Sequence, residues 1–160
     1  MSRVLYGGET TPDIAELLEE AMSRYGETDK AEASLVEALR RSPKSLPVHF
    51  SLYKFYFYKK RLDDAEKVVQ NSLLEAASQG GFNPNWETLD GNSTDWGNSS
   101  ARFYLFSLKA LAFIRLRQGN ETGCLSVLNK LLELDQGDKV GASVISDIAK
   151  GAYGNYKSSL

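Results

Sequence analysis

Several residue types that carry common chemistries are scarce in this chain. A single cysteine, Cys124, excludes a disulfide within the chain, and His49 is the one histidine. Zinc sites are built from several Cys and His ligands, so we expect none. The segment DGNSTD at 90–95 resembles a calcium loop but lacks the required glutamate, and no glycine-rich phosphate loop occurs. We therefore expect no metal, no cofactor and no enzymatic activity.

Long hydrophobic runs and an excess of one charge are also missing. The chain has 19 Lys and Arg against 21 Asp and Glu, which are interleaved and give a net charge of −2. No basic field is available to attract a phosphate backbone, so we do not expect nucleic-acid binding. No apolar run approaches the roughly 20 residues that span a membrane, and residues 1–8 are too short and too polar for a signal peptide. We expect a cytoplasmic protein without membrane contact.

Short amphipathic patterns that repeat along the chain are abundant. The hydrophobic fraction of 42% is enough to build the core of one domain. Residues 12–43 align with residues 46–77 at a period of 34, which places Ala31 on Ala65 and Leu35 on Val69. A period of this length indicates a repeat of helical units.

Each copy of the repeat is expected to form two helices. In the first copy Thr11 is the candidate N-cap, Pro12 occupies the first helical position, and Gly26 ends the helix. The second helix is expected from about 29 to 41, because Pro43 prevents its continuation. The first helix is indicated by apolar residues that recur at helical spacing: Ile14, Leu17, Leu18, Ala21, Met22 and Tyr25.

A third copy appears at 105–136, with Gly119 in its turn. Cys124 falls where the first two copies have Ala31 and Ala65. A thiol at this position is either reactive or a small buried group between paired helices, and the register favours the buried group.

This pattern resembles the tetratricopeptide repeat, a helix-turn-helix unit of 34 residues with small residues at two fixed positions. The chain departs from it at the eighth position, where Glu19 and Tyr53 stand in the first two copies and only the third has a small residue, Ala112. The resemblance covers roughly residues 12–136 and is that of a divergent member. It implies an all-α solenoid, a superhelix of about three helix hairpins with a C-terminal capping helix.

The register divides the chain into segments. One more helix with Asp138 as N-cap and Gly151 as a stop is expected to cap the stack. The predicted segments are an N-terminal arm at 1–11, a single domain at 12–150 with repeats at 12–45, 46–79 and 105–138, an inserted loop at 79–100, a capping helix at 138–150 and a flexible tail at 151–160.

The resemblance also implies that the first helix of each hairpin lines a concave groove. In the second copy His49, Leu52, Tyr53 and Tyr56 suffice for the core, so the aromatic residues on the other face either bind a partner or are covered within the chain. His49 is expected to be a core histidine and not a general base. The candidate peptide-binding residues in the groove are Phe50, Lys54, Phe57, Tyr58, Phe106, Lys109, Phe113 and Arg117.

The loop at 79–100 interrupts the repeat and holds both tryptophans. The third copy starts at 105 where the period places it at 80, so 25 residues are inserted. Loops of this length are functional or disordered, and the aromatic residues argue for order. Trp86 or Trp96 is therefore expected to fold back against the groove aromatics as a lid. The alternative is that the tryptophans pin the loop on the outside.

These features favour a non-enzymatic scaffold whose groove binds a peptide or partner segment, as an assembly accessory or co-chaperone. Lys54 and Lys109 would select an acidic group on the ligand. The groove lacks the asparagine of the clamp with which some tetratricopeptide domains hold chaperone C-termini, so that ligand is not expected. The alternative function is structural, a homodimer formed through the aromatic face.

Overall fold

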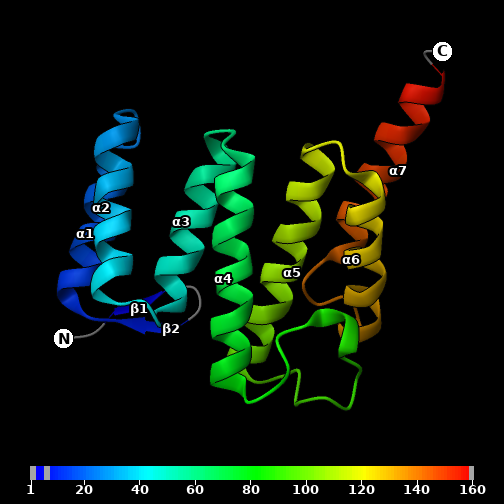
Figure 1. The fold of residues 1–160 in the computed structure, drawn as a ribbon, viewed down its shortest axis with the longest axis horizontal. Helices are drawn as coiled ribbons and strands as arrows, with labels where there is room; N and C mark the ends of the chain where they lie inside the picture. The colour runs from blue at the N-terminus through cyan, green and yellow to red at the C-terminus, as the bar shows by residue number, and fades with distance from the viewer. Residues whose placement is uncertain (1–2, 6–7, 159–160) are drawn as a thin grey trace. The chain divides into compact units, whose positions relative to one another are not determined.

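The computed structural model describes residues 3–5 and 8–158 of the chain (Figure 1). In this part the chain forms seven α-helices, one short 3-10 helix and one pair of short strands. The all-α class predicted from the sequence is confirmed. The chain divides into two compact units, Met1–Ala76 and Ala77–Leu160. Among the described helices, none combines the length and the apolar character that crossing a membrane requires.

The first unit begins with a strand pair for which the sequence pattern gave no signal. Strand β1 (Arg3–Leu5) pairs antiparallel with β2 (Gly8–Thr10), with Val4 opposite Glu9. Thr10 is buried, and β2 contacts helix α3. The strands therefore belong to the packing of the first unit.

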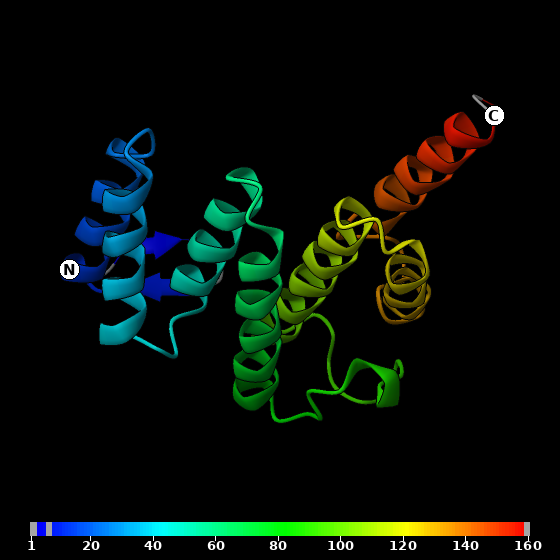
Figure 2. The same ribbon diagram turned by 45° about the horizontal axis from the view of Figure 1, so that its top comes forward.

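Helices α1 (Pro12–Ser23) and α2 (Thr28–Arg41) form the first hairpin, and the two ribbons lie side by side in Figures 1 and 2. Both helices begin and end within three residues of the predicted positions. Ala31 and Ala38 are fully buried, which permits close approach of the paired helices. Ile14, Ala38 and Val48 form a common core cluster.

Helix α3 (Leu46–Tyr58) follows, and α4 (Leu62–Gly80) begins in the same unit. Ser45 caps α3, since its hydroxyl accepts from the backbone N–H of Val48 at 3.4 Å. His49 is buried as predicted, and its Nε2 donates to the carbonyl oxygen of Pro43 at 2.8 Å. Its Nδ1 has no hydrogen-bond partner among the described residues.

A charged network joins α2 to the corner between α3 and α4. The Arg61 guanidinium contacts the carboxylate of Glu32 at 2.9 Å and that of Asp64 at 2.9 Å. The hydroxyl of Tyr56 donates to Glu32 at 2.6 Å. These hydrogen bonds, the one from Arg61 first, lower the pKa of the Glu32 carboxyl from its usual 4.5.

The second unit contains the 3-10 helix η1 (Trp86–Thr88) and helices α5 (Ser99–Arg117), α6 (Glu121–Leu134) and α7 (Ala142–Ser158). Helices α5 and α6 pair as the third predicted hairpin, side by side in both views (Figures 1 and 2). The N-cap of α5 is Asn98. Cys124 is fully buried in this hairpin, as its register indicates.

The predicted bounds of the last helix, 138–150, are wrong at both ends. Asp138, Gly137 and Gly141 have positive φ angles of 54°, 88° and 81°, so the chain turns there and α7 begins only at Ala142. Asp138 still acts at the start of α7, because its carboxylate accepts from the Ser143 N–H at 3.2 Å. The helix passes through Gly151 to Ser158, where a tail was expected. A glycine ends a helix where it turns left-handed, and within a helix it costs only about 1 kcal/mol relative to alanine.

Candidate functional site

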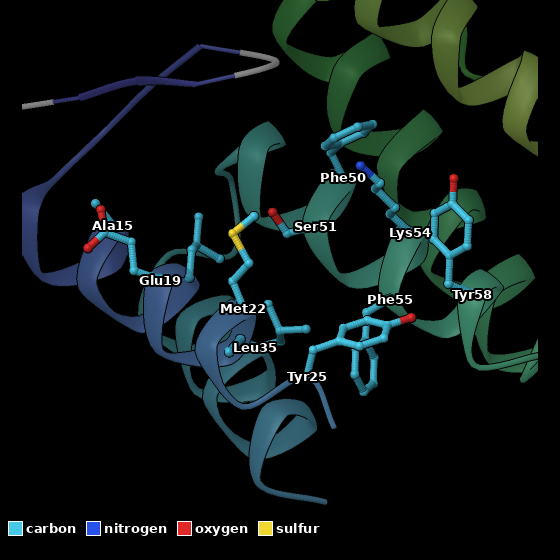
Figure 3. Close-up of a pocket in the computed structure, with 12 residues that line it drawn as sticks. Ala15, Glu19, Met22, Tyr25, Leu35, Phe50, Ser51, Lys54, Phe55 and Tyr58 are labelled. Atoms are coloured by element: carbon cyan, nitrogen blue, oxygen red, sulfur yellow. The ribbon is translucent and has the colours of Figure 1, made fainter. Parts of the chain in front are cut away.

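A hollow of about 380 Å³ lies between α1 and α3 in the first unit (Figure 3). Figure 3 shows the α1 side chains on one side and those of α3 on the other. The lining residues are Ala15, Leu18, Glu19, Ala21 and Met22 of α1, Tyr25 of the turn after α1, Leu35 of α2, and Phe50, Ser51, Lys54, Phe55 and Tyr58 of α3. Most of these side chains are apolar, so the hollow offers mainly apolar contact.

The α1 wall is formed by apolar residues that the neighbouring helices leave uncovered. Ile14 and Ala21 are buried, whereas Met22 is 78% exposed and Tyr25 is 41% exposed. Met22 and Tyr25 therefore lie outside the core, although they share the helical spacing of the buried residues. Periodicity placed all six residues in one stripe, but α2 and α3 cover only its first part. The uncovered end of the stripe becomes one wall of the hollow.

The α3 wall is aromatic with one ammonium group at its rim. The Nζ of Lys54 lies 5.6 Å from the ring centroid of Phe50 and 5.9 Å from that of Tyr58. These three residues are four apart, so they form one line along the exposed face of α3. Each cation–π contact contributes about 0.5–1 kcal/mol at an exposed site, so the two rings hold the ammonium beside the hollow.

The ends of α1 and α3 are tied together at one end of the hollow. Lys59 Nζ donates to the carbonyl oxygen of Tyr25 at 2.7 Å and lies 4.0 Å from the centroid of the Tyr25 ring. The rings of Tyr25 and Phe55 meet edge to face, with centroids 5.9 Å apart. These contacts fix the separation of the two walls.

Opposite charges stand on the two walls, Glu19 on α1 and Lys54 on α3. Within the part of the chain whose side chains are described, no three His, Cys, Asp or Glu residues lie close enough together to hold a metal ion. The hollow can bury an apolar group and pair with charges at its rim.

Three of the predicted groove residues, Phe50, Lys54 and Tyr58, line this hollow. Phe57 does not line it; its ring packs edge to face on Tyr58 at 5.6 Å. The other predicted residues belong to the second unit. There Phe106, Lys109 and Phe113 are half-buried. The guanidinium of Arg117 lies 5.3 Å from the centroid of the Phe113 ring.

The inserted loop is ordered by its own aromatic cluster. The ring of Trp96 lies 5.3 Å from Phe82 and 6.2 Å from Tyr104, and Phe82 lies 5.0 Å from Tyr104. The indole N–H of Trp96 donates to the carbonyl oxygen of Asp90 at 3.1 Å. Trp86 begins η1 and is half-buried.

The cluster decides between the two interpretations of Trp96. Tyr104 and Phe106 project about 200° apart around α5, because a helix turns about 100° per residue. Phe113 lies nine residues from Tyr104, about half a turn away around the same helix. Trp96 therefore packs on the side of α5 away from Phe106 and Phe113. The predicted lid over those two residues is wrong for Trp96, which pins the loop as the alternative interpretation proposed.

No protein-family model matches the chain. Over 132 residues it is 30% identical to a protein of Azotobacter chroococcum mcd 1, described as "Uncharacterized 19.8 kDa protein in nifW 5'region". The match covers 80% of this chain and 73% of that protein.

Proposed function

This chain belongs to the family of the Azotobacter chroococcum 19.8 kDa protein, and we propose that it is a non-enzymatic module that binds a segment of a partner protein. The hollow between α1 and α3 receives an apolar side chain of that segment. Glu19 and Lys54, on opposite walls, pair with charged groups that flank it.

The observation that carries this proposal is the exposure of large apolar side chains around a preformed hollow. Met22 is 78% exposed and Tyr58 is 60% exposed, on opposite walls of a space of about 380 Å³. Apolar pockets that bind ligands begin at roughly 300 Å³. Burying one large apolar side chain contributes about 1.5–3 kcal/mol, so an occupied hollow supplies a substantial anchor.

The resemblance to tetratricopeptide repeats supports a peptide as the ligand. In that family the first helices of successive hairpins face the bound segment, and here the hollow lies between α1 and α3, the first helices of two predicted repeats. We infer a solenoid of such hairpins and an accessory role in assembling a larger complex.

The relative's name places its gene in the 5′ region of nifW. The product of a neighbouring gene is a reasonable first partner to test, so the nifW product is the first defined bait.

The test compares partner capture by wild type, Met22→Glu and a matched control. Val36 is also an exposed apolar residue of the first unit, at 47%, but it lies on α2 and does not line the hollow. We expect Met22→Glu to lose a partner that wild type and Val36→Glu both retain, because the carboxylate would have to be desolvated against the apolar anchor. Equal capture by all three proteins would overturn the proposal. Equal loss in both variants would overturn the assignment to this hollow.

A further inference from the structure

A second hollow, of about 420 Å³, lies within the second unit. Three segments form it: the loop at 91–97, the first turns of α5, and the connection at 134–140 between α6 and α7. Leu105, Leu134 and Val140 are buried beneath it, and Trp96 stands in its wall. The segment DGNSTD at 90–95 and Trp96 lie here, but only the fold brings them together with α5 and residues 134–140.

The charged groups of this hollow are unevenly satisfied. The Asp95 carboxylate accepts from the Gly97 N–H at 2.9 Å, and that of Asp135 accepts from the Val140 N–H at 2.8 Å. The side chains of Arg102 and Lys139 make no hydrogen bond or ion pair with any described residue, although Arg102 is half-buried. A guanidinium that has lost part of its hydration without gaining an acceptor is a ready partner for an anion.

We propose that this hollow binds a small organic anion, with its acid group at Arg102 and Lys139 and a planar ring against Trp96. The planar fork of arginine binds carboxylate and phosphate groups through two parallel hydrogen bonds. The volume lies in the range of small-molecule sites and is larger than a bare inorganic ion needs. The indole offers an aromatic surface to a ring. This proposal is independent of the peptide-binding function, which rests on the first unit.

Titration with four probes tests the site and separates the two possible acid groups. Trp86→Phe leaves Trp96 as the only tryptophan, so its fluorescence reports on this hollow. AMP presents a phosphate on a ring system, benzoate presents a carboxylate on a ring, adenosine lacks the acid group, and inorganic phosphate lacks the ring. We expect saturable binding of AMP or benzoate at one site per chain. Adenosine and inorganic phosphate should bind with at least tenfold lower affinity.

Variants then locate the bound acid group. We expect Arg102→Gln and Lys139→Gln each to lower the affinity for the bound probe about tenfold. Asp95→Asn should raise that affinity, because it removes a negative charge that repels the anion. Lys67→Gln removes one positive charge in the first unit and serves as the matched control. Because Lys139 is exposed, its variant remains informative if Arg102→Gln unfolds.

Three results would overturn the proposal. Absence of saturation with both AMP and benzoate would exclude an organic anion. Inorganic phosphate binding as tightly as AMP or benzoate would exclude the ring contact. If Lys67→Gln lowered the affinity for the probe as much as Arg102→Gln and Lys139→Gln do, the probe would be responding to the net charge of the protein and not to a site in this hollow.

Discussion

The hydroxyl of Tyr104 donates a hydrogen bond of 2.7 Å to the carbonyl oxygen of Pro84, twenty residues earlier in the chain. Tyr104 is fully buried in α5, and Pro84 lies in the inserted loop. Lys130 of α6 makes a second bond of this kind, to the carbonyl oxygen of Leu89 at 2.7 Å. The inserted loop is therefore a packed part of the second unit.

Replacing Tyr104 by Phe is expected to lower the free energy of unfolding by about 1–2 kcal/mol, because the Pro84 carbonyl loses its donor. Urea unfolding followed by tryptophan fluorescence measures the change. Tyr58→Phe, at a position 60% exposed, is the control and should stay within about 0.5 kcal/mol of wild type. The same cost in both variants would contradict the role of this hydrogen bond.

Acid is expected to weaken the junction of α2, α3 and α4 through Glu32. Its pKa is lowered in the folded state, chiefly by the hydrogen bond from Arg61, so its contribution is present above the unfolded pKa near 4.5 and is lost as pH falls through the lower folded value. Glu32→Gln should cost about 1–2 kcal/mol at pH 7, since hydrogen bonds to charged groups contribute more than neutral ones.

Urea unfolding at several pH values between 7 and 3 tests this dependence. The difference between wild type and Glu32→Gln should shrink as the carboxylate becomes protonated. Glu27→Gln is the matched control, because Glu27 pairs with Lys30 on the surface at 3.1 Å and such pairs contribute little. A pH-independent difference for Glu32→Gln would contradict the assignment.

Cys124 is expected to resist thiol reagents in the native protein. Its side chain is fully buried, and burial is the main cause that raises the pKa of the thiol. Labelling with DTNB should be slow in buffer and rapid in urea. Cys124→Ser should cost about 1–3 kcal/mol, because a buried hydroxyl needs a partner that the thiol does not. Rapid labelling of the folded protein would contradict this.

The proposed function predicts a monomer across a dilution series, while self-association through the aromatic face predicts a dimer. Mass measured by light scattering separates them. Phe50→Ala and Phe113→Ala should leave a monomer's mass unchanged. A doubled mass that either substitution reduces would favour the homodimer and contradict the proposed function.

The helices could be predicted because their signals are local. Ala31, Ala65 and Cys124 share one register position, and all three are fully buried. The pattern failed where local signals are ambiguous. Gly151 continues a helix here because its backbone is not left-handed, and Met22 is exposed because its stripe extends beyond the neighbours that cover it.

The candidate sites were only partly predictable, because part of each site depends on how separate helices pack. Phe50, Lys54 and Tyr58 could be found because they repeat at helical spacing on a helix that has a second apolar face. The opposite wall, with Met22 and Tyr25, depends on how far apart α1 and α3 stand. Arg102 and Lys139 are 37 positions apart in sequence and line one hollow only through the packing of α5 and the connection after α6.

The sequence by itself determined the helical class, the register of the hairpins and the burial of Cys124, because hydrophobic periodicity and small residues act over a few neighbouring positions. Only the tertiary structure decided which apolar residues stay exposed, which side of α5 Trp96 packs against, and which charged side chains lack a partner. Those outcomes depend on distances between segments that are far apart in the chain, and no local pattern encodes such distances.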